Sequence, residues 1–293
     1  MSTTVPLPPT LIRKILCPVD FSATSADALR FAAALNSGSE IIVLHVYLFQ
    51  PPPYPDEEQV EARAVDRRDW QAVAETNLKK FVRTAVGHLS PRTDTVVVQG
   101  LATSAISHAA ATFHPDVIVM GRHDRAGSGR SLLGSVAERA LQAIATPILM
   151  VPPGYPISRD GCLVREILCP VNNTLLAYDS LRFAAAVATG YRAPLTLLRV
   201  KEEAARELVP DPCSLATSLT SLPCRVHELP GTEIAGEVLT LASAANRGLL
   251  VLGAWHRPLA DWTILGDRAS ALVREATCPV VVVPVRGHRL PGE

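Results

Sequence analysis

One loop of this 293-residue chain combines glycine residues, positive charge and the start of a helix, and these three features together favour the binding of an anion. The loop follows an apolar run that ends at Gly121, and it leads into a helix that opens at Gly134 and Ser135. The amides of a helix N-terminus point at such a ligand, and the helix dipole favours negative charge there. Three arginines in the loop add positive charge: Arg122, Arg125 and Arg130. The loop is therefore expected to bind phosphate.

A second loop supplies a carboxylate. An apolar run ends at Asp20, and Ser22 and Ser25 follow it in positions that cap a helix. Both loops also have an ordinary structural explanation. Asp20 can be a turn residue, and residues 135–138, Ser-Val-Ala-Glu, have the pattern of a capping box that satisfies helix amides without a ligand. Taken singly, neither loop separates a structural role from a binding site.

Strand-like and helix-like segments alternate along the chain and would bring the two loops together. Ala-rich amphipathic segments separate β-branched apolar runs. Five such runs lie in the first half: residues 14–19, 40–47, 95–99, 117–120 and 148–151. Strands that alternate with helices predict βαβ units and a parallel sheet covered on both faces. In such doubly wound, Rossmann-like α/β sheets, ligands bind beyond the carboxyl ends of the strands, where both loops lie.

The same pattern occurs twice. Ile15-Leu-Cys-Pro-Val-Asp20 recurs 152 positions later, ending at Asn172, whereas residues 147–152 recur 132 positions later. The second copy is therefore 20 residues shorter (152 − 132), and the difference falls between its second and third strands. A duplication of this kind is the strongest organisational signal in the chain. The predicted parts are a tail (1–12), a first domain (13–152), a linker (153–162), a second domain (163–286) and a tail (287–293).

Four segments of the first copy resemble the universal stress protein family: Pro18-Val-Asp-Phe-Ser22, Met120-Gly121, Leu132-Leu-Gly-Ser-Val-Ala-Glu-Arg-Ala-Leu141 and Thr146-Pro-Ile-Leu-Met-Val151. The resemblance covers nearly the whole chain, twice. It implies two tandem five-stranded parallel sheets of order 3-2-1-4-5 and a regulatory role in a stress response. For one branch of the family it also implies ATP binding through a G-x2-G-x9-G-[ST] loop. Gly121 and Gly134-Ser135 match that spacing, with Asp124 in place of the second glycine.

Carried over position by position, the resemblance implies a set of nucleotide contacts. Adenine and ribose contacts would fall on Asp20, Val46, Met120 and Gly121, and phosphate contacts on Gly134, Ser135 and Val136. Asp124 and Arg130, from the same loop, complete the candidate site. A carboxylate at Asp124 would repel polyphosphate by about 4 kcal/mol for a charge pair ~4 Å apart at an effective dielectric of ~20. Neighbouring arginines, or Mg²⁺ bound by Asp124, would offset this repulsion, so the expected ligand is ATP or another adenine nucleotide, with or without Mg²⁺.

The second copy departs further from the family pattern. Asn172 stands where the first copy has Asp20, and His256 stands at the second glycine position. Gly266 is followed by Asp267, a good helix N-cap whose negative charge lies where the family pattern places an anion. We therefore expect the second copy to keep the fold and to lack the site, so that the chain binds nucleotide in the first domain alone.

Composition and charge argue against several classes of protein. Lys plus Arg equal Asp plus Glu at 28 each, so the basic footprint of a nucleic-acid-binding protein is absent. The sequence shows neither an apolar window long enough for a membrane span nor the pattern of a secretory signal. The six cysteines lack the spacing of metal or redox motifs. We expect a cytoplasmic protein with free thiols, in which Cys17, Cys169 and Cys278 are buried apolar residues.

No motif identifies the chain as an enzyme. The sequence lacks a G-x-S-x-G elbow, an H-E-x-x-H pair and a Walker lysine loop. Four histidines lack metal-ligand spacing: His45, His108, His114 and His123. Two alternatives to a nucleotide-binding regulator stay open. One is a scaffold that binds a partner protein and leaves the crevice empty, and the other is a slow ATP hydrolase in which Asp20 and Asp124 face a bound nucleotide.

The fifth strand of each copy predicts how the copies assemble. In the order 3-2-1-4-5 this strand lies at an edge, where its backbone groups are unpaired. Residues 148–151 and 280–283 are apolar and lack the lysines that commonly protect such edges. We therefore predict that the two fifth strands pair and form an internal pseudo-dimer, and that any homodimer of whole chains uses another surface.

Overall fold

The computed structural model describes residues 12–35, 38–48, 57–87, 92–123, 133–157, 163–171, 175–200, 212–230, 233–245, 247–257 and 262–286. The first half forms β1 Lys14–Val19, α1 Ala23–Leu35, β2 Glu40–Tyr47, α2 Glu57–Val86, β3 Thr93–Gln99, α3 Ala102–Phe113, β4 Val117–Gly121, α4 Ser135–Ala143 and β5 Ile148–Val151. The second half forms β6 Glu166–Val171, α5 Leu175–Tyr191, β7 Leu195–Val200, α6 Pro212–Leu219, β8 Cys224–Leu229, α7 Ile234–Ala244, β9 Gly248–Arg257, β10 Trp262–Ile264, α8 Asp267–Glu275 and β11 Val280–Arg286.

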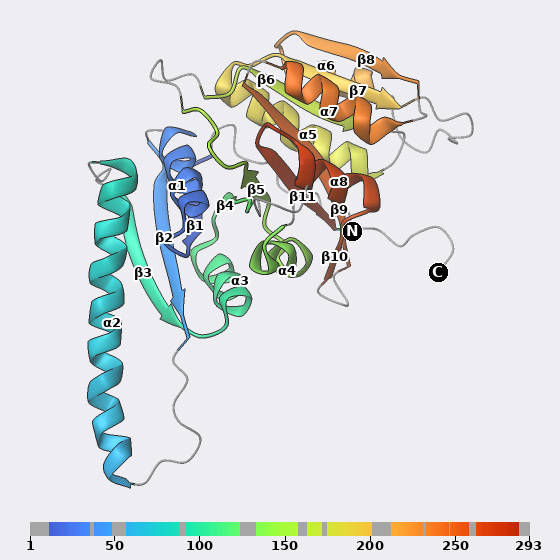
Figure 1. Cartoon of the computed structure of the whole chain (residues 1–293). Coiled ribbons are helices and arrows are strands. Elements are labelled where there is room, and N and C mark those ends of the chain that lie inside the picture. Colours follow the sequence, from blue (N-terminus) through green and yellow to red (C-terminus); the bar gives the residue numbers. More distant parts are fainter. Residues whose placement is uncertain are drawn as a thin grey trace.

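The strands of both halves belong to one continuous sheet. In the first half the order is β3-β2-β1-β4-β5 and every neighbouring pair is parallel, which confirms the predicted order 3-2-1-4-5. The second half repeats this order as β8-β7-β6-β9-β11, again with parallel pairs. The predicted α/β fold with two tandem doubly wound sheets is therefore confirmed (Figure 1).

Helices cover both faces of the sheet, and each face carries one apolar layer that spans both copies. One layer packs α1, α2, α5 and α6 against the strands. The other packs α3, α4, α7 and α8 against the opposite face. Because both faces are covered, central strands such as β1 and β6 consist of nearly continuous apolar residues, as buried parallel strands do. The predicted burial of Cys17, Cys169 and Cys278 is confirmed.

The two copies meet at their fifth strands. Strand β5 pairs with β11 in the antiparallel direction, with Met150 opposite Val280 and Ile148 opposite Val282. All of these side chains are buried. Each apolar edge thus satisfies the backbone groups of the other, and the predicted internal pseudo-dimer is confirmed.

Two elements differ from the sequence-based expectation. The 20 additional residues of the first copy extend a helix: α2 has 30 residues and projects well beyond the sheet, whereas its counterpart α6 has 8 (Figure 1). In the second copy β9 does not end at Gly253 but continues to Arg257 and pairs with β10, which was not predicted. Strand β10 packs against α4 of the first copy, so a contact between the copies supports this hairpin.

The chain that follows β5 is attached to α1. The backbone N–H of Gly154 donates a hydrogen bond of 2.7 Å to Oδ2 of Asp27, and the Tyr155 ring packs edge-on against Phe31 at 5.7 Å. The boundaries of the predicted linker, 153 and 162, stay a prediction. Among the helices in the described ranges, none combines the length and apolarity needed to cross a membrane.

Candidate functional site

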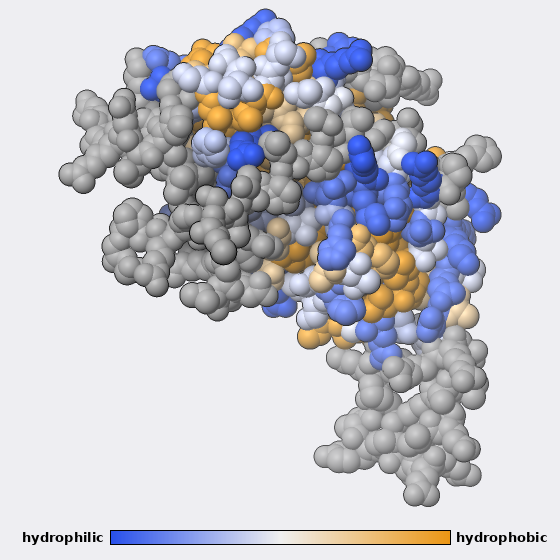
Figure 2. Space-filling view, turned by 180° about the vertical axis from the view of Figure 1, so that it is seen from behind, coloured by the Kyte–Doolittle hydropathy of each residue, from blue (hydrophilic) through white to orange (hydrophobic). Residues whose placement is uncertain are grey.

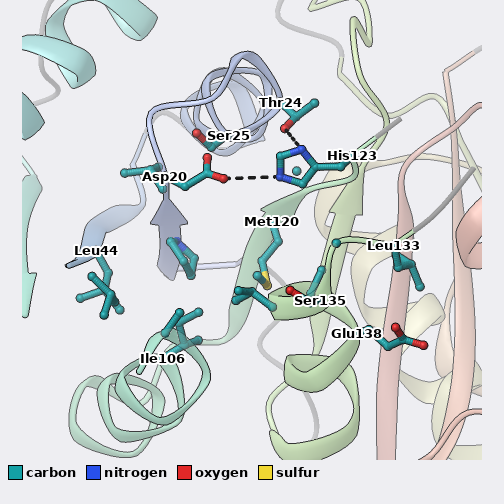
Figure 3. A pocket seen from close by; sticks show the side chains of 18 residues that line it. Asp20, Thr24, Ser25, Leu44, Ile106, Met120, His123, Leu133, Ser135 and Glu138 are labelled. Carbon is teal, nitrogen blue, oxygen red and sulfur yellow. Dashed lines mark hydrogen bonds and ion pairs between the residues drawn. The ribbon is translucent and has the colours of Figure 1, made fainter. Parts of the chain in front are cut away.

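A cavity of about 580 Å³ opens at the carboxyl ends of β1 and β4 (Figure 3). The winding of the first sheet reverses between these two strands, because β2 and β3 lie on one side and β5 on the other. Ligands of doubly wound sheets bind at this switch point. The volume falls within the range of about 300–1,000 Å³ that is common for small-molecule sites.

The inner part of the cavity is apolar. It is lined by side chains from β2, α3, β4 and the segment before α4: Leu44, Val46, Ile106, Met120 and Leu133. Val136, in the first turn of α4, also lines the cavity and is exposed. On the face seen in Figure 2, hydrophobic and hydrophilic areas lie side by side on the described residues. The cavity therefore offers a planar ligand an apolar floor.

Asp20 lies on the polar side of the cavity, where a tight turn fixes its carboxylate. The N–H and the hydroxyl of Ser22 donate to Oδ1 of Asp20, the N–H at 3.0 Å. Ser22 in turn caps α1, because its Oγ accepts a hydrogen bond of 3.1 Å from the N–H of Ser25. Burial alone would raise the pKa of Asp20, but hydrogen bonds from Ser22 and Ser25 and the facing His123 outweigh burial and lower the pKa. Asp20 is thus a turn residue that also lines the cavity.

Phe21, next to Asp20, has an unusual backbone conformation. Its φ of 65° lies in the left-handed region, which a bulky side chain rarely adopts. Two aromatic contacts hold it there, with ring centroids 4.1 Å from His45 and 5.4 Å from Phe81. Backbone strain of this kind concentrates at functional sites. The conformation turns the chain from β1 into α1 within three residues.

His123 closes the polar side of the cavity, although sequence analysis gave it no role. Its Nε2 lies 3.5 Å from Oδ2 of Asp20, and its Nδ1 lies 3.2 Å from Oγ1 of Thr24 (Figure 3). The edge of its ring also borders α4, because a Cβ built at Gly134 would lie 3.0 Å from Cδ2 of His123. One side chain therefore touches the ends of β1, α1 and α4. Side chains alternate along a strand, so His123 is expected on the same face of the β4 end as Gly121. This spacing of two residues from Gly121 could have identified His123 as a site residue.

Gly121 lines the cavity and is required by packing against α1. A Cβ at this position would lie 2.3 Å from the backbone oxygen of Thr24 and 2.6 Å from the adjacent carbonyl carbon. Real Cβ atoms do not approach backbone atoms so closely, so only glycine lets α1 pack directly on the end of β4. This contact sets the distance between the Asp20 turn and β4.

The first turn of α4 lines the opposite wall and lacks the predicted capping box. Gly134 is the N-cap (φ −60°, ψ 145°), Ser135 is already helical, and within the described residues no side chain caps the helix. Glu138 does not reach back to the N-cap but pairs with Arg274 of α8 at 3.7 Å. The helix begins one residue too early for Ser135 to cap it. The first amides of α4, which lack intrahelical partners, therefore lie along the cavity.

Arg122 does not contribute its charge to the cavity, contrary to the sequence-based expectation. Its side chain is buried, with 6% exposed, and its Nη1 donates to the carbonyl oxygens of Val273 at 3.2 Å and Ala276 at 2.5 Å. Both acceptors belong to the second copy. Strand alternation directs Arg122 to the side opposite His123, where α8 lies.

The structure brings seven of the nine predicted site residues onto this one cavity: Asp20, Val46, Met120, Gly121, Gly134, Ser135 and Val136. The other two, Asp124 and Arg130, lie outside the described residues, as does Arg125. Sequence analysis missed Thr24 and His123, and it assigned Glu138 to a cap. Within the described residues, no three His, Cys, Asp or Glu side chains are grouped so as to hold a metal ion.

The corresponding region of the second copy is built differently. Asp267 is the first residue of α8 and not its N-cap, because Gly266 occupies the N-cap (φ −62°, ψ 162°). The prediction of an Asp267 cap was therefore wrong. As with α4 at Ser135, helix α8 begins one residue earlier than the sequence pattern suggests. His256 lies in β9, opposite Thr263 of β10, so the end of β9 belongs to an antiparallel strand pair. Asn172 lies outside the described residues.

A doubly wound α/β sheet with a crevice at its switch point defines the class to which many nucleotide-binding proteins belong. Residues 11–152 match the universal stress protein family. The chain is 28% identical over 147 residues to universal stress protein MJ0531 of Methanocaldococcus jannaschii, across 48% of this chain and 82% of that protein. It is 29% identical over 143 residues to a universal stress protein of Thermus aquaticus, across 48% of this chain and 99% of that protein. The first copy therefore belongs to the universal stress protein family.

The repeated fold also has a counterpart among solved structures. A universal stress protein from Archaeoglobus fulgidus aligns with a TM-score of 0.66 over 92% of this chain and 98% of that chain, at 18% sequence identity. At this identity the likeness concerns the fold alone. It extends across both copies, so the second copy shares the fold of the first.

Proposed function

We propose that the crevice of the first copy binds one adenine nucleotide, ATP or a relative of it, and that the chain acts as a nucleotide-responsive regulator in a stress response. One observation carries the proposal: residues that the family pattern assigns to adenine, ribose and phosphate, from four separate segments, line a single cavity of suitable size. The family resemblance supplies the chemical identity of the ligand.

The lining divides into three chemically distinct parts. The apolar floor around Val46 and Met120 suits a flat base, which gains from contact with apolar side chains. Oδ2 of Asp20 faces the cavity and can accept a hydrogen bond from a ribose hydroxyl when His123 moves aside. The first turn of α4, with Ser135 and Val136, offers amides and the positive end of a helix dipole to phosphate.

The charges of the lining set a further condition on the ligand. Within the described lining, the formally charged groups are the carboxylates of Asp20 and Glu138. A phosphate ~4 Å from a carboxylate is repelled by about 4 kcal/mol at an effective dielectric of ~20. Mg²⁺ reduces the net charge of ATP, so we expect ATP to bind more tightly with Mg²⁺ than without it, and AMP to depend less on the ion.

The second copy is proposed to bind no nucleotide. Asp267 begins α8, so a carboxylate stands where the first copy has the small hydroxyl of Ser135. Strand β9 also continues to Arg257 and pairs with β10, whereas β4 ends at Gly121. We therefore propose one nucleotide per chain.

Titration calorimetry with ATP, ADP and AMP, each with and without Mg²⁺, tests the proposal. The Ser135→Asp variant introduces the carboxylate of the second copy and should abolish binding. Ser104→Asp is the matched control, because Ser104 is exposed in the first turn of α3 and does not line the cavity. No heat of binding for any of the three nucleotides at millimolar concentration would reject the proposal and would favour a scaffold with an empty crevice.

A further inference from the structure

The candidate site of the first copy is held in place by a helix of the second copy. Helix α8 makes two separate contacts with the walls of the crevice. One is with the end of β4, through Arg122, and the other is with α4, through Glu138. The wall formed by β2, in contrast, lies on the far side of β1 from the second copy.

Arg122 acts as a C-cap for α8. Ala276 is the C-cap residue of this helix, and the last carbonyls of any helix lack intrahelical partners and carry the negative end of its dipole. The buried guanidinium donates to the carbonyl oxygens of Val273 and Ala276, which satisfies two of these groups. Removing the guanidinium would leave buried carbonyls unsatisfied, so this contact fixes the position of the β4 end against α8.

The same segment of chain forms part of the cavity. Gly121 and His123, on either side of Arg122, both line the crevice. Gly121 has no room to shift towards α1, because the backbone of Thr24 lies where a Cβ of residue 121 would be. A ligand that takes Oδ2 of Asp20 must displace His123, and only one peptide unit separates His123 from the buried Arg122. A displacement that moves the backbone at His123 therefore acts on the contact of Arg122 with α8.

The second contact involves the wall that carries the helix N-terminus. Oε1 of Glu138 lies 3.7 Å from Nη2 of Arg274, and strand β10 packs against α4 as well. Both side chains of the ion pair are partly exposed, so we expect it to contribute less than the buried Arg122 contact. Together the two contacts tie α4 and the β4 end to one rigid element.

We propose that α8 of the second copy positions the binding site of the first copy, with Arg122 as the principal positioning residue, and that ligand binding and α8 docking are coupled. The coupling rests on the proposed nucleotide function, whereas the positioning does not. A copy that has lost its own site would thus serve the site of the other. Because coupling is reciprocal, a ligand that orders the crevice also protects α8.

Hydrogen exchange of the full chain tests the positioning without any ligand. In Arg122→Gln the amides in the first turn of α4 should exchange at least about fivefold faster than in the unmodified chain, the lower end of typical couplings. Amides of β1 and β2 should not change. Arg225→Gln is the matched control, since Arg225 is exposed on the edge strand β8. Equal exchange of α4 in Arg122→Gln and Arg225→Gln would overturn the positioning role.

The coupling is tested by adding Mg-ATP to the same samples. Binding should slow amide exchange at the end of α8 in the unmodified chain, and this protection should be lost in Arg122→Gln and reduced in Arg274→Gln. If the unmodified chain binds no nucleotide, the proposed function and the coupling both fail, while the exchange of α4 still decides the positioning. Nucleotide binding with no protection of α8, or with equal affinity in Arg122→Gln, overturns the coupling alone.

Discussion

Replacing Gly121 by alanine tests whether close packing of α1 on β4 builds the crevice. The added Cβ would lie 2.3 Å from the backbone oxygen of Thr24, whereas an ordinary van der Waals contact needs 3.4–4 Å. The shortfall is more than 1 Å against backbone, which cannot move aside as the end of a flexible side chain can. Helix α1 must therefore shift away from β4, and the Asp20 turn at its start must shift with it.

The expected loss of stability follows from this shift. Overpacking a well-packed core costs about 1–3 kcal/mol. A backbone collision belongs in the upper part of this range, and each kcal/mol lowers Tm by about 2–4 °C for a domain of 150–250 residues. Thermal denaturation followed by circular dichroism measures the change. Because the shift also moves Asp20 away from the β4 and α4 walls of the cavity, we expect weaker nucleotide binding in the same variant.

Gly236→Ala is the matched control for Gly121→Ala. Gly236 lies in α7, where an added Cβ would lie 3.6 Å from Oε2 of Glu233, an ordinary contact. Alanine is a better helix former than glycine by about 0.8–1.0 kcal/mol, so this variant should be slightly more stable than the unmodified chain. The reasoning is refuted if Gly121→Ala is as stable as the unmodified chain, or if both variants lose the same stability.

Three further predictions concern ionisation and assembly. Burial raises the pKa of Cys17 and Cys169 to about 12 and that of Cys278 to about 11, so a disulfide reagent at pH 8 should modify these thiols only after unfolding; rapid modification of the native chain would contradict their burial. The lowered pKa of Asp20 means that its carboxylate stabilises the fold above about pH 4, its unfolded pKa, and that this contribution is lost as the pH falls through the folded pKa. Asp20→Asn should therefore unfold with a weaker dependence on acid pH, and an unchanged dependence would count against the hydrogen-bonded turn. Val282→Lys places an amine in the buried β5–β11 junction and should destabilise the chain by at least about 2 kcal/mol in denaturant titrations, whereas full stability would rule out this junction in solution.

The fold could be predicted because its signals are local. Strands β1, β2 and β5 have the predicted bounds, since each is a short apolar run that is buried on both faces. The junction could be predicted as well, because an apolar edge without lysine needs a partner, and the duplication supplies one. The β9–β10 hairpin could not, because it packs against α4, which is distant in sequence.

The candidate site shows where local patterns stop being informative. The Ser-x-x-Glu pattern at Ser135 matched a capping box, but Glu138 is engaged by Arg274 from the second copy. The charge of Arg122 suggested phosphate binding, but the acceptor on its side of the strand is α8. In each case a contact between copies decides the side chain's role. His123 was missed because it was considered only as a metal ligand, and its partners Asp20 and Thr24 come together only in the fold.

Native mass spectrometry of the full chain with Mg-ATP tests the central claim most directly, because it counts the nucleotides that each chain holds. We predict one nucleotide per chain, retained in Ser104→Asp and absent in Ser135→Asp. A chain that holds none, a chain that holds two, or a single nucleotide that persists in Ser135→Asp would contradict a site at the first turn of α4 in the first copy.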